Sequence, residues 1–296
     1  MTAGPEVVCR EPRFAEGPVW CAATGSDAAS IVCTSVSEGA VYRVDIAAGT
    51  CTPLAVTGGG ANGAAPCADG GFLVTQNGGL DFAAIGMFED PPVCTPVAPG
   101  LQRVAPDSSV EYLTPDPLQA PNDLAVATDG TVYFTDPPPW PLPDDARGRV
   151  WAYERDGSLS LVADGFYYPN GIGIEDDGML VVVENGLMGR PTFGLVRLDR
   201  NGDRELFADQ TGDGFCFDVD GRLYVAGGVH GVTVLEPDGS VVEVLEIPGR
   251  GVTTNCCFGG DDLRTLFATE AVPGGVVAWE GMPAPGTPVV AWPGPA

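Results

Sequence analysis

Residues 121–136 read PNDLAVATDGTVYFTD, and this stretch decides how the chain folds. Short runs of apolar and β-branched residues lie on both sides of Asp129-Gly130, which is typical of two strands joined by a tight turn. We predict an inner strand at 124–128, a two-residue hairpin turn at Asp129-Gly130 and a second strand at 131–136. Two more strands are expected within 150–164, again joined by an Asp-Gly turn. The stretch therefore opens a four-stranded antiparallel sheet.

The same unit recurs along the chain. Five residues with oxygen-bearing side chains stand seven residues before the Asp of a turn, and Glu16 begins a looser first unit. The six positions are Glu16, Asn62, Asn122, Asn170, Asp213 and Asn255. They are separated by 46, 60, 48, 43 and 42 residues, a period typical of propeller blades. We predict an all-β fold, a six-bladed β-propeller of four-stranded antiparallel blades, as a single domain over residues 1–296.

Two points of this architecture stay open. A sandwich of irregular strands is the rival all-β fold, but it does not explain six units with the same internal order. Either residues 6–9 or residues 289–292 are able to supply the last outer strand of the ring. The 60-residue interval also indicates an insertion at 81–117, which we expect, together with the Pro-rich segment 137–141, to roof one face of the ring.

Composition excludes several functions. The chain has 14 Lys plus Arg against 40 Asp plus Glu, a net charge of −26, and its basic residues are all Arg. Nucleic acid is therefore not an expected partner, and Schiff-base and pyridoxal phosphate chemistry have no lysine to use. No apolar run approaches the ~20 residues of a membrane span, and residues 1–10 show no secretory signal. We expect a cytoplasmic protein that does not bind a membrane.

The cysteines and the single histidine narrow the chemistry further. Nine Cys, an odd number with no C-x-x-C, predict buried reduced thiols. His230 is the only His. A structural zinc site with several His ligands is therefore not expected, and a Ser-His-Asp triad would have to use His230.

We call these six positions, one in each repeat, the repeated register, and they suggest a cation site. Residues at one position of every repeat converge on the axis if the repeats form a ring. Glu16, Asn122, Asn170 and Asp213 then offer two carboxylates and two amide oxygens, which suit Ca²⁺ and also Mn²⁺ or Mg²⁺. Asp136 and Glu184 end second strands on the same face, where they either line the pocket or hold neighbouring groups.

Several motifs resemble those of the senescence marker protein (regucalcin)/gluconolactonase family. They are residues 14–20 (FAEGPVW), 121–123 (PND), 169–171 (PNG), 213–218 (DGFCFD) and 253–260 (TTNCCFGG). The resemblance implies a six-bladed propeller with one divalent cation on its axis, bound by Glu16, Asn122, Asn170 and Asp213. Calcium is the expected ion, with Mn²⁺, Fe²⁺, Zn²⁺ and Mg²⁺ as alternatives. Family members are chiefly lactonases, so the implied substrate is a small lactone or ester.

The resemblance also implies roles for single residues. Asp213 is expected to be the base that activates water, and Asp123 either orients the neighbouring ligand or accepts the proton instead. Asn62 and Asn255 share the register but are not usual ligands in the family, and we assign them either to the substrate pocket or to the support of the ligands. Sugar lactonases of the family often carry an Arg at the position of Ala120. The candidate rim residues are Trp20, Trp140, Tyr167, Tyr168 and His230, a more aromatic set that leaves room for a less polar lactone or another ester.

The sequence is also compatible with two other classes of function. One is a metal-dependent isomerase or lyase on the same axial site, and the other is a calcium-binding propeller without enzymatic activity. We expect a monomer or a weak homo-oligomer.

Overall fold

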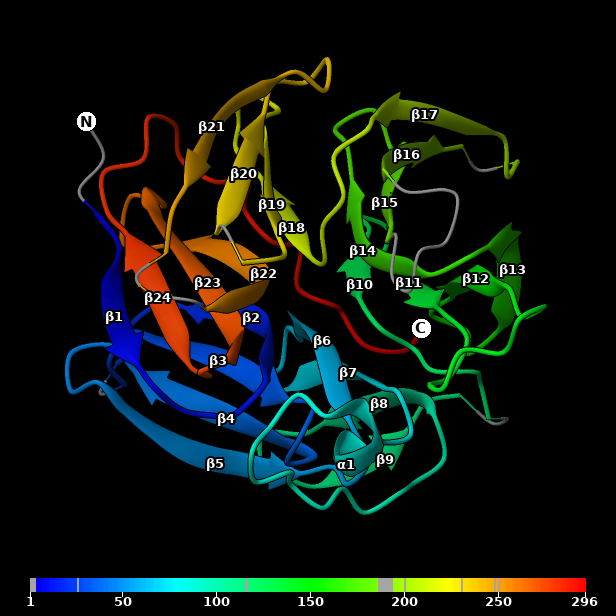
Figure 1. Ribbon diagram of the computed structural model, residues 1–296, viewed down its shortest axis with the longest axis horizontal. Coiled ribbons are helices and arrows are strands. Elements are labelled where there is room, and N and C mark those ends of the chain that lie inside the picture. Colours follow the sequence, from blue (N-terminus) through cyan, green and yellow to red (C-terminus); the bar gives the residue numbers. More distant parts are fainter. Residues whose placement is uncertain are drawn as a thin grey trace.

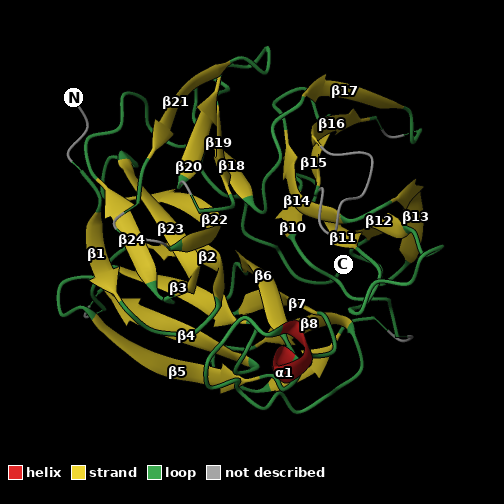
Figure 2. Cartoon of the chain, viewed as in Figure 1, coloured by secondary structure: helices red, strands yellow, loops and turns green. Residues whose placement is uncertain are grey.

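The computed structural model describes residues 4–25, 27–114, 117–185, 194–199, 201–229, 231–247, 249 and 251–296. Its strands form six antiparallel four-stranded sheets arranged in a ring, which confirms the predicted propeller (Figure 1). Besides these strands, the described chain contains one short helix, α1 (Phe82–Ile85), shown in red in Figure 2. This helix lies in the expected insertion of the second blade, between β7 and β8.

Each blade takes its strands from consecutive parts of the chain. Blade 1 contains β2 (Ala15–Cys21), β3 (Ser30–Ser35), β4 (Ala40–Asp45) and β5 (Thr50–Val56). Blade 2 contains β6 (Ala61–Pro66), β7 (Phe72–Gln76), β8 (Gly100–Val104) and β9 (Val110–Tyr112). Blade 3 contains β10 (Leu124–Val126), β11 (Val132–Asp136), β12 (Gly148–Tyr153) and β13 (Leu159–Phe166). Blade 4 contains β14 (Pro169–Ile174), β15 (Leu180–Glu184), β16 (Gly194–Leu198) and β17 (Arg204–Ala208). Blade 5 contains β18 (Phe215–Phe217), β19 (Leu223–Ala226), β20 (Val232–Leu235) and β21 (Val241–Leu245).

The sixth blade closes the ring. Its inner three strands are β22 (Val252–Gly259), β23 (Thr265–Val272) and β24 (Val276–Trp279), and its outer strand is β1 (Glu6–Cys9). Val7 pairs with Val277, so the beginning of the chain completes the blade made by its end. Of the two segments that the sequence left open for this role, the structure therefore uses residues 6–9.

The turns between inner and second strands differ from the prediction. In blade 3 the N–H of Ala127 donates to Thr131 O at 2.8 Å and the N–H of Gly130 donates to Ala127 O at 2.9 Å. The hairpin loop therefore has three residues, 128–130, and the predicted two-residue turn is wrong. Gly130 has φ 92°, where glycine is favoured, and Asp129 Oδ1 accepts the N–H of Thr131 at 3.0 Å. These two contacts explain why Asp-Gly marks the turns.

Hydrophobic cores lie between adjacent blades. Val183 and Leu195 of blade 4, for example, pack with Leu223 and Val225 of blade 5, and all four are at most 1% exposed. Such interfaces hold the blades in a ring, in which the inner strand of every blade lies next to the central axis. The inner strands all begin at the same end of this axis. We call the face at which the inner strands begin the upper face, and the opposite face the lower face.

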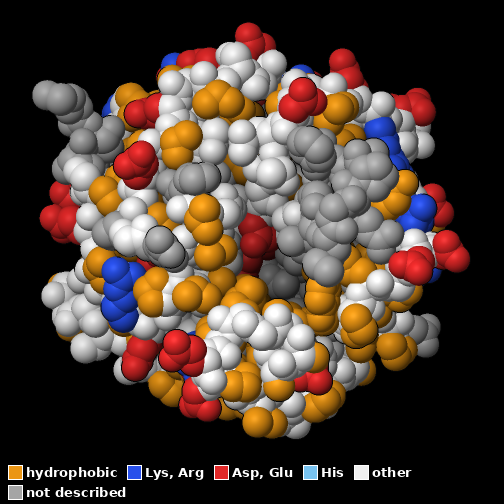
Figure 3. All heavy atoms as spheres, in the orientation of Figure 1, with side chains coloured by type: hydrophobic (Ala, Val, Ile, Leu, Met, Phe, Trp, Pro, Cys, Tyr) orange, Lys and Arg blue, Asp and Glu red, His pale blue; other side chains and the backbone are white. Residues whose placement is uncertain are grey.

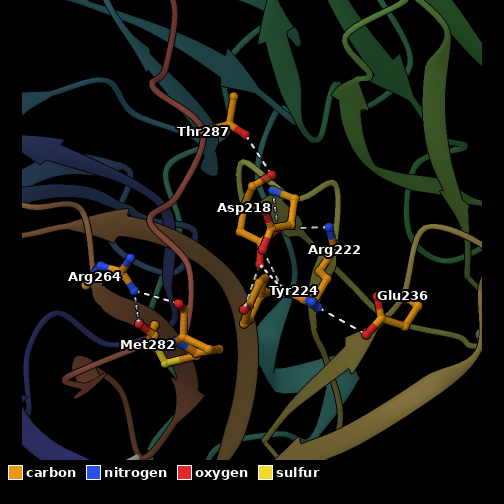
Figure 4. Close-up of polar contacts among 9 residues, drawn as sticks. Asp218, Arg222, Tyr224, Glu236, Arg264, Met282 and Thr287 are labelled. Atoms are coloured by element: carbon orange, nitrogen blue, oxygen red, sulfur yellow. Dashed lines mark hydrogen bonds and ion pairs between the residues drawn. The ribbon is translucent and has the colours of Figure 1, made fainter.

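The C-terminal segment 282–296 crosses the lower face. Its contacts with Arg264 of blade 6 and Asp218 of blade 5 are shown in Figure 4. Buried Asp218 accepts hydrogen bonds from Arg222 and from the Tyr224 hydroxyl, at 3.4 and 3.1 Å. Farther along, the N–H of Trp292 donates to the Pro66 carbonyl of blade 2 at 2.8 Å. The segment therefore ties several blades together from below.

Trp292 is expected to be the main anchor of this segment. Its side chain is 1% exposed and packs in the core between blades 2 and 3. Replacing a buried Trp by Ala costs about 3–5 kcal/mol, so we expect Trp292→Ala to lower the free energy of unfolding by about that amount. Denaturant unfolding of this variant measures the loss. Val289→Ala is the matched control, because Val289 is 60% exposed in the same segment and should change little. Equal stability of the two variants would contradict an anchoring role.

All nine cysteines are free thiols, and five of them are buried. The prediction of buried reduced thiols therefore holds for those five, while the other four are partly exposed. None of the helices in the described residues has the length and apolar character needed to cross a membrane.

Candidate metal centre

A cavity of about 390 Å³ opens at the upper end of the propeller axis. Five of the six residues in the repeated register line it: Glu16, Asn62, Asn122, Asn170 and Asp213. Loops from all six blades contribute to its wall. Figure 3 shows a hollow in the middle of one face of the molecule, with an acidic side chain inside and hydrophobic side chains around part of its rim. The register thus brings five oxygen-bearing side chains to one cavity.

Three amide oxygens in this cavity have no hydrogen-bond partner in the described structure. They are Oδ1 of Asn62, Asn122 and Asn170, whose residues are 5%, 7% and 4% exposed. A buried polar atom left without a partner costs about 1–3 kcal/mol, and such atoms are uncommon in folded proteins. Three on one cavity wall are explained if the site holds a group that attracts oxygen lone pairs. A hard cation meets this requirement.

The two carboxylates of the set also favour a cation. Burial raises the pKa of Glu16 well above its usual value, and the negative charges of Asp213 and Asp123 raise it further. Burial and the charge of Asp123 likewise raise the pKa of Asp213. No arginine among the described residues lines the cavity to offset these charges. A divalent cation would offset them, so the residues present fit such an ion.

Amide oxygens are essential to this donor set. In the described part of the chain, no three His, Cys, Asp or Glu side chains are grouped so as to hold a metal. A cation bound by Glu16 and Asp213 must therefore complete its coordination with Asn oxygens or with water. This composition suits Ca²⁺ better than Zn²⁺, which prefers nitrogen and sulfur ligands.

Hydrogen bonds between neighbouring blades hold the Asn residues in place. In each of three blades a fully buried second-strand threonine donates its hydroxyl to the backbone carbonyl of an Asn in the next blade. The pairs are Thr34 with Asn62, Thr75 with Asn122, and Thr135 with Asn170. Sequence reasoning missed these residues. The available signal was a threonine next to last in the second strand of each of these three blades.

The rest of the ring uses both backbone and side-chain donors. The N–H of Gly171 donates to Asp213 O at 3.0 Å, and the N–H of Gly214 donates to Thr254 O at 2.7 Å. The Thr254 hydroxyl then donates to Ala15 O, next to Glu16, at 2.7 Å. Each candidate ligand is thus fixed through its own or an adjacent backbone carbonyl.

A second set of side chains supports the loops that precede the asparagines. Asp136 Oδ1 accepts the N–H of Ala120 at 2.8 Å, and Glu184 Oε1 accepts the N–H of Tyr168 at 2.7 Å. Both acids end their strands, and both N–H groups lie two residues before an Asn of the cavity. Gln76 makes the corresponding bond to the N–H of Gly60 in blade 2, at 2.7 Å. Two roles were open for Asp136 and Glu184, and these contacts favour the one in which the two acids hold neighbouring backbone N–H groups rather than line the pocket.

Asp136→Ala is expected to weaken both folding and cation binding. Asp136 is fully buried, and it also accepts the N–H of Gln119 at 2.9 Å and the indole N–H of Trp151 at 3.1 Å. Each donor left unpaired costs about 1–3 kcal/mol, so we expect a loss of at least ~2 kcal/mol in the free energy of unfolding. Asp136→Asn keeps one acceptor oxygen and should lose less. Calcium titration calorimetry and denaturant unfolding measure both effects. Calcium affinity unchanged in a folded Asp136→Ala would contradict the positioning role.

Asp123 and Asn255 lie outside the upper cavity. The Asn255 amide donates to both carboxylate oxygens of Asp123 at 3.0 Å, and the N–H of Cys256 donates to Asn255 Oδ1 at 2.8 Å. Both residues line a second cavity of about 430 Å³, formed farther along the inner strands and beside residues 287–290. Asp123 therefore faces this second cavity, whereas the neighbouring Asn122 lines the upper one. In blade 6, Thr254 takes the place in the upper cavity that the register assigned to Asn255.

The predicted rim residues separate into three groups. Trp140 and Tyr168 line the upper cavity, as does Asn62. Trp20 and Tyr167 do not line it. The Trp20 ring stacks on Phe267 with ring centroids 5.7 Å apart, and the Tyr167 ring lies 4.3 Å from the guanidinium carbon of Arg147. Glu16 pairs with Thr34 and Trp20 pairs with Ile31, three residues apart on β3, so Trp20 lies about 10 Å farther along the inner strand. His230 lies outside the described residues.

The profile described as SMP-30/Gluconolactonase/LRE-like region matches residues 14–272, which is most of the chain. The chain belongs to this family. Its match begins just before Glu16 and extends past Asn255, so it spans all six positions of the repeated register.

Relatives of this SMP-30/gluconolactonase family member agree with the assignment. Regucalcin of Xenopus laevis is 33% identical over 70 residues, and that of Danio rerio is 39% identical over 62 residues. These alignments span 23% and 20% of this chain and the same shares of the relatives. The sequence match therefore covers about a quarter or less of the curated relatives' length.

Solved structures extend the likeness to nearly the whole chain. A gluconolactonase of Xanthomonas campestris is 25% identical, with a TM-score of 0.73 over 93% of this chain and 89% of that one. A calcium-binding regucalcin of Agrobacterium tumefaciens is 20% identical, with a TM-score of 0.75 over 98% and 97%. At 20% identity the second likeness shows the shared fold alone.

Proposed function

We propose that this protein is a divalent-cation-dependent hydrolase that opens a lactone, or a related carboxylic ester, to the hydroxy acid. The observation that carries the proposal is the group of three unpartnered amide oxygens and two carboxylates in the upper cavity. Membership of the SMP-30/gluconolactonase family and the likeness to a gluconolactonase support the reaction class.

Glu16, Asn122, Asn170 and Asp213 are the residues that would hold the cation, and Asn62 offers a fifth oxygen in the same cavity. Calcium suits this all-oxygen set. When bound, the cation supplies a Lewis acid that polarises the substrate carbonyl and stabilises negative charge on its oxygen.

A side chain of the protein accepts and returns the proton that is transferred in the reaction. We assign Asp213 as the base because it lines the upper cavity and is partly exposed to it. It accepts a proton from water as the water oxygen bonds to the carbonyl carbon. The ring carbon–oxygen bond then breaks, and Asp213 returns the proton to the leaving ring oxygen. Lactone and water thus give one hydroxy acid.

Asp123 is assigned a positioning role. Both of its carboxylate oxygens are bound by the Asn255 amide, and neither residue lines the upper cavity. Asp123 lies directly after Asn122, so the pair with Asn255 restrains the backbone that carries the candidate ligand.

The reaction is tested by supplying calcium-loaded protein with a panel of lactones and measuring the acid released. We expect one equivalent of acid for each lactone ring opened, at a rate proportional to protein concentration. Absence of acid release with every lactone of the panel would contradict a hydrolase.

A further inference from the structure

The wall of the upper cavity differs in character from its base. Among the described residues, the oxygen-bearing residues of the repeated register gather around the axis, whereas the surrounding wall is apolar on one side and also includes the polar residues Asn77, Asn185 and Thr211. The apolar wall includes Val36, Leu80, Met87, Trp140, Val252 and Ala271. Ala120, which also lines the cavity, adds no polar group. A bound molecule therefore meets oxygen ligands at one end and a hydrocarbon surface on the side that Leu80 and Met87 provide.

The insertion of blade 2 supplies part of this apolar wall. Leu80 and Met87 flank helix α1, and both line the cavity. Between them Phe82 is 1% exposed and packs against Phe14 and Phe88, with ring centroids 5.8 and 5.4 Å apart. A buried aromatic anchor thus fixes the helix, and the side chains on either side of it are held over the cavity.

Further contacts hold the same insertion from both sides. The Arg13 guanidinium lies 4.7 Å from the Phe88 ring centroid and donates to Asp90 O at 2.6 Å. On the other side, the N–H of Gly59 donates to Thr95 O at 2.8 Å, and the Cys94 thiol donates to Gly59 O at 2.9 Å. These contacts hold the insertion in one position over the cavity. Arg13 contacts the insertion and does not line the cavity.

From this arrangement, and resting on the proposed hydrolase function, we infer that the preferred substrate is an uncharged lactone carrying an alkyl or acyl substituent. The lactone carbonyl would lie toward the oxygen ligands and the substituent against Leu80 and Met87. Each methylene buried on this wall is expected to raise kcat/KM about fourfold. A hydroxyl buried there without a partner lowers it on the order of tenfold. A carboxylate or phosphate substituent would meet no arginine among the described lining residues.

The inference is tested with six-membered lactones that share one ring and differ in substituent. The series is δ-valerolactone, δ-hexalactone, δ-octalactone, δ-decalactone and glucono-δ-lactone, each with calcium-loaded protein. We expect kcat/KM to rise along the alkyl series and to be lowest for the polyhydroxylated lactone. A higher kcat/KM for glucono-δ-lactone than for δ-decalactone would overturn the inferred substrate class and leave the hydrolase proposal standing. If no lactone is opened, both proposals fail together.

Variants of the wall test the same point at the level of residues. For Leu80→Ser and Met87→Ser we expect the ratio of kcat/KM for δ-decalactone to that for δ-valerolactone to fall about tenfold. Val93→Ser is the matched control, because Val93 lies in the same insertion, is 94% exposed and does not line the cavity. Met87 is 40% exposed, so Met87→Ser should fold even if Leu80→Ser does not. A ratio unchanged in Met87→Ser would contradict the assigned wall.

Discussion

Replacing Asp213 by Asn should lower kcat for lactone opening by about 10²–10⁴-fold, the usual contribution of a general base. The substituted amide would still offer an oxygen to a cation, as Asn122 and Asn170 do, but it could not accept a proton as the carboxylate does. The backbone contacts at this position, from Gly171 N–H and to Ala226 O, do not involve the side chain and should remain. We therefore expect a folded protein that still binds calcium, although more weakly because one ligand charge is lost, and that loses turnover.

Steady-state kinetics and calcium titration calorimetry together measure this outcome. Asp209→Asn is the matched control, since Asp209 is an exposed acid four residues earlier that does not line the upper cavity. Full turnover in Asp213→Asn would exclude Asp213 as the base. Calcium binding by the parent protein without turnover of any lactone would instead favour a calcium-binding propeller without enzymatic activity.

Removal of the divalent cation should abolish activity and also destabilise the protein. Binding at 100 times the dissociation constant adds about 2.7 kcal/mol to the free energy of unfolding. For a chain of 296 residues that corresponds to a rise in Tm of roughly 4 °C. The physical reason is the group of buried oxygens without partners, which the cation would satisfy, together with the mutual repulsion of Glu16 and Asp213.

The measurement compares chelated protein with protein refilled separately with Ca²⁺, Mn²⁺, Fe²⁺, Zn²⁺ or Mg²⁺. Thermal unfolding provides a readout that is independent of turnover, and Glu16→Gln should reduce the calcium-dependent shift in Tm. Full activity and an unchanged Tm after chelation would contradict a metal centre at this site.

The spacing of the six repeats was sufficient to predict the fold, because Asp-Gly turns and residues at a fixed distance before them can be recognised within short stretches of sequence. The closing strand was not decided by sequence, since both candidate segments are short and β-compatible and only pairing with β24 distinguishes them. The hairpin loop of blade 3 is one residue longer than predicted. Its third residue is the Gly, whose left-handed backbone permits the closing hydrogen bond.

The site was predictable only as far as the register extends. The register brought Glu16, Asn62, Asn122, Asn170 and Asp213 to one cavity. It could not reveal the contact between Asp123 and Asn255, which are 132 residues apart in sequence. The placement of Trp20 against Phe267 was missed for a similar reason, because the distance of an inner-strand residue from the upper face depends on how far along the strand it lies.

The closure of the sixth blade by β1 has a consequence for synthesis of the protein. Val7 pairs with Val277, so β1 leaves the ribosome 270 residues ahead of its partner. At about 5–20 residues per second, β1 waits on the order of 15–50 s for that partner. During this interval the nascent chain is an open arc of blades with an unpaired strand edge. We expect a chain truncated before residue 276 to aggregate rather than close, which makes synthesis of β24 the step that commits this protein to its closed form.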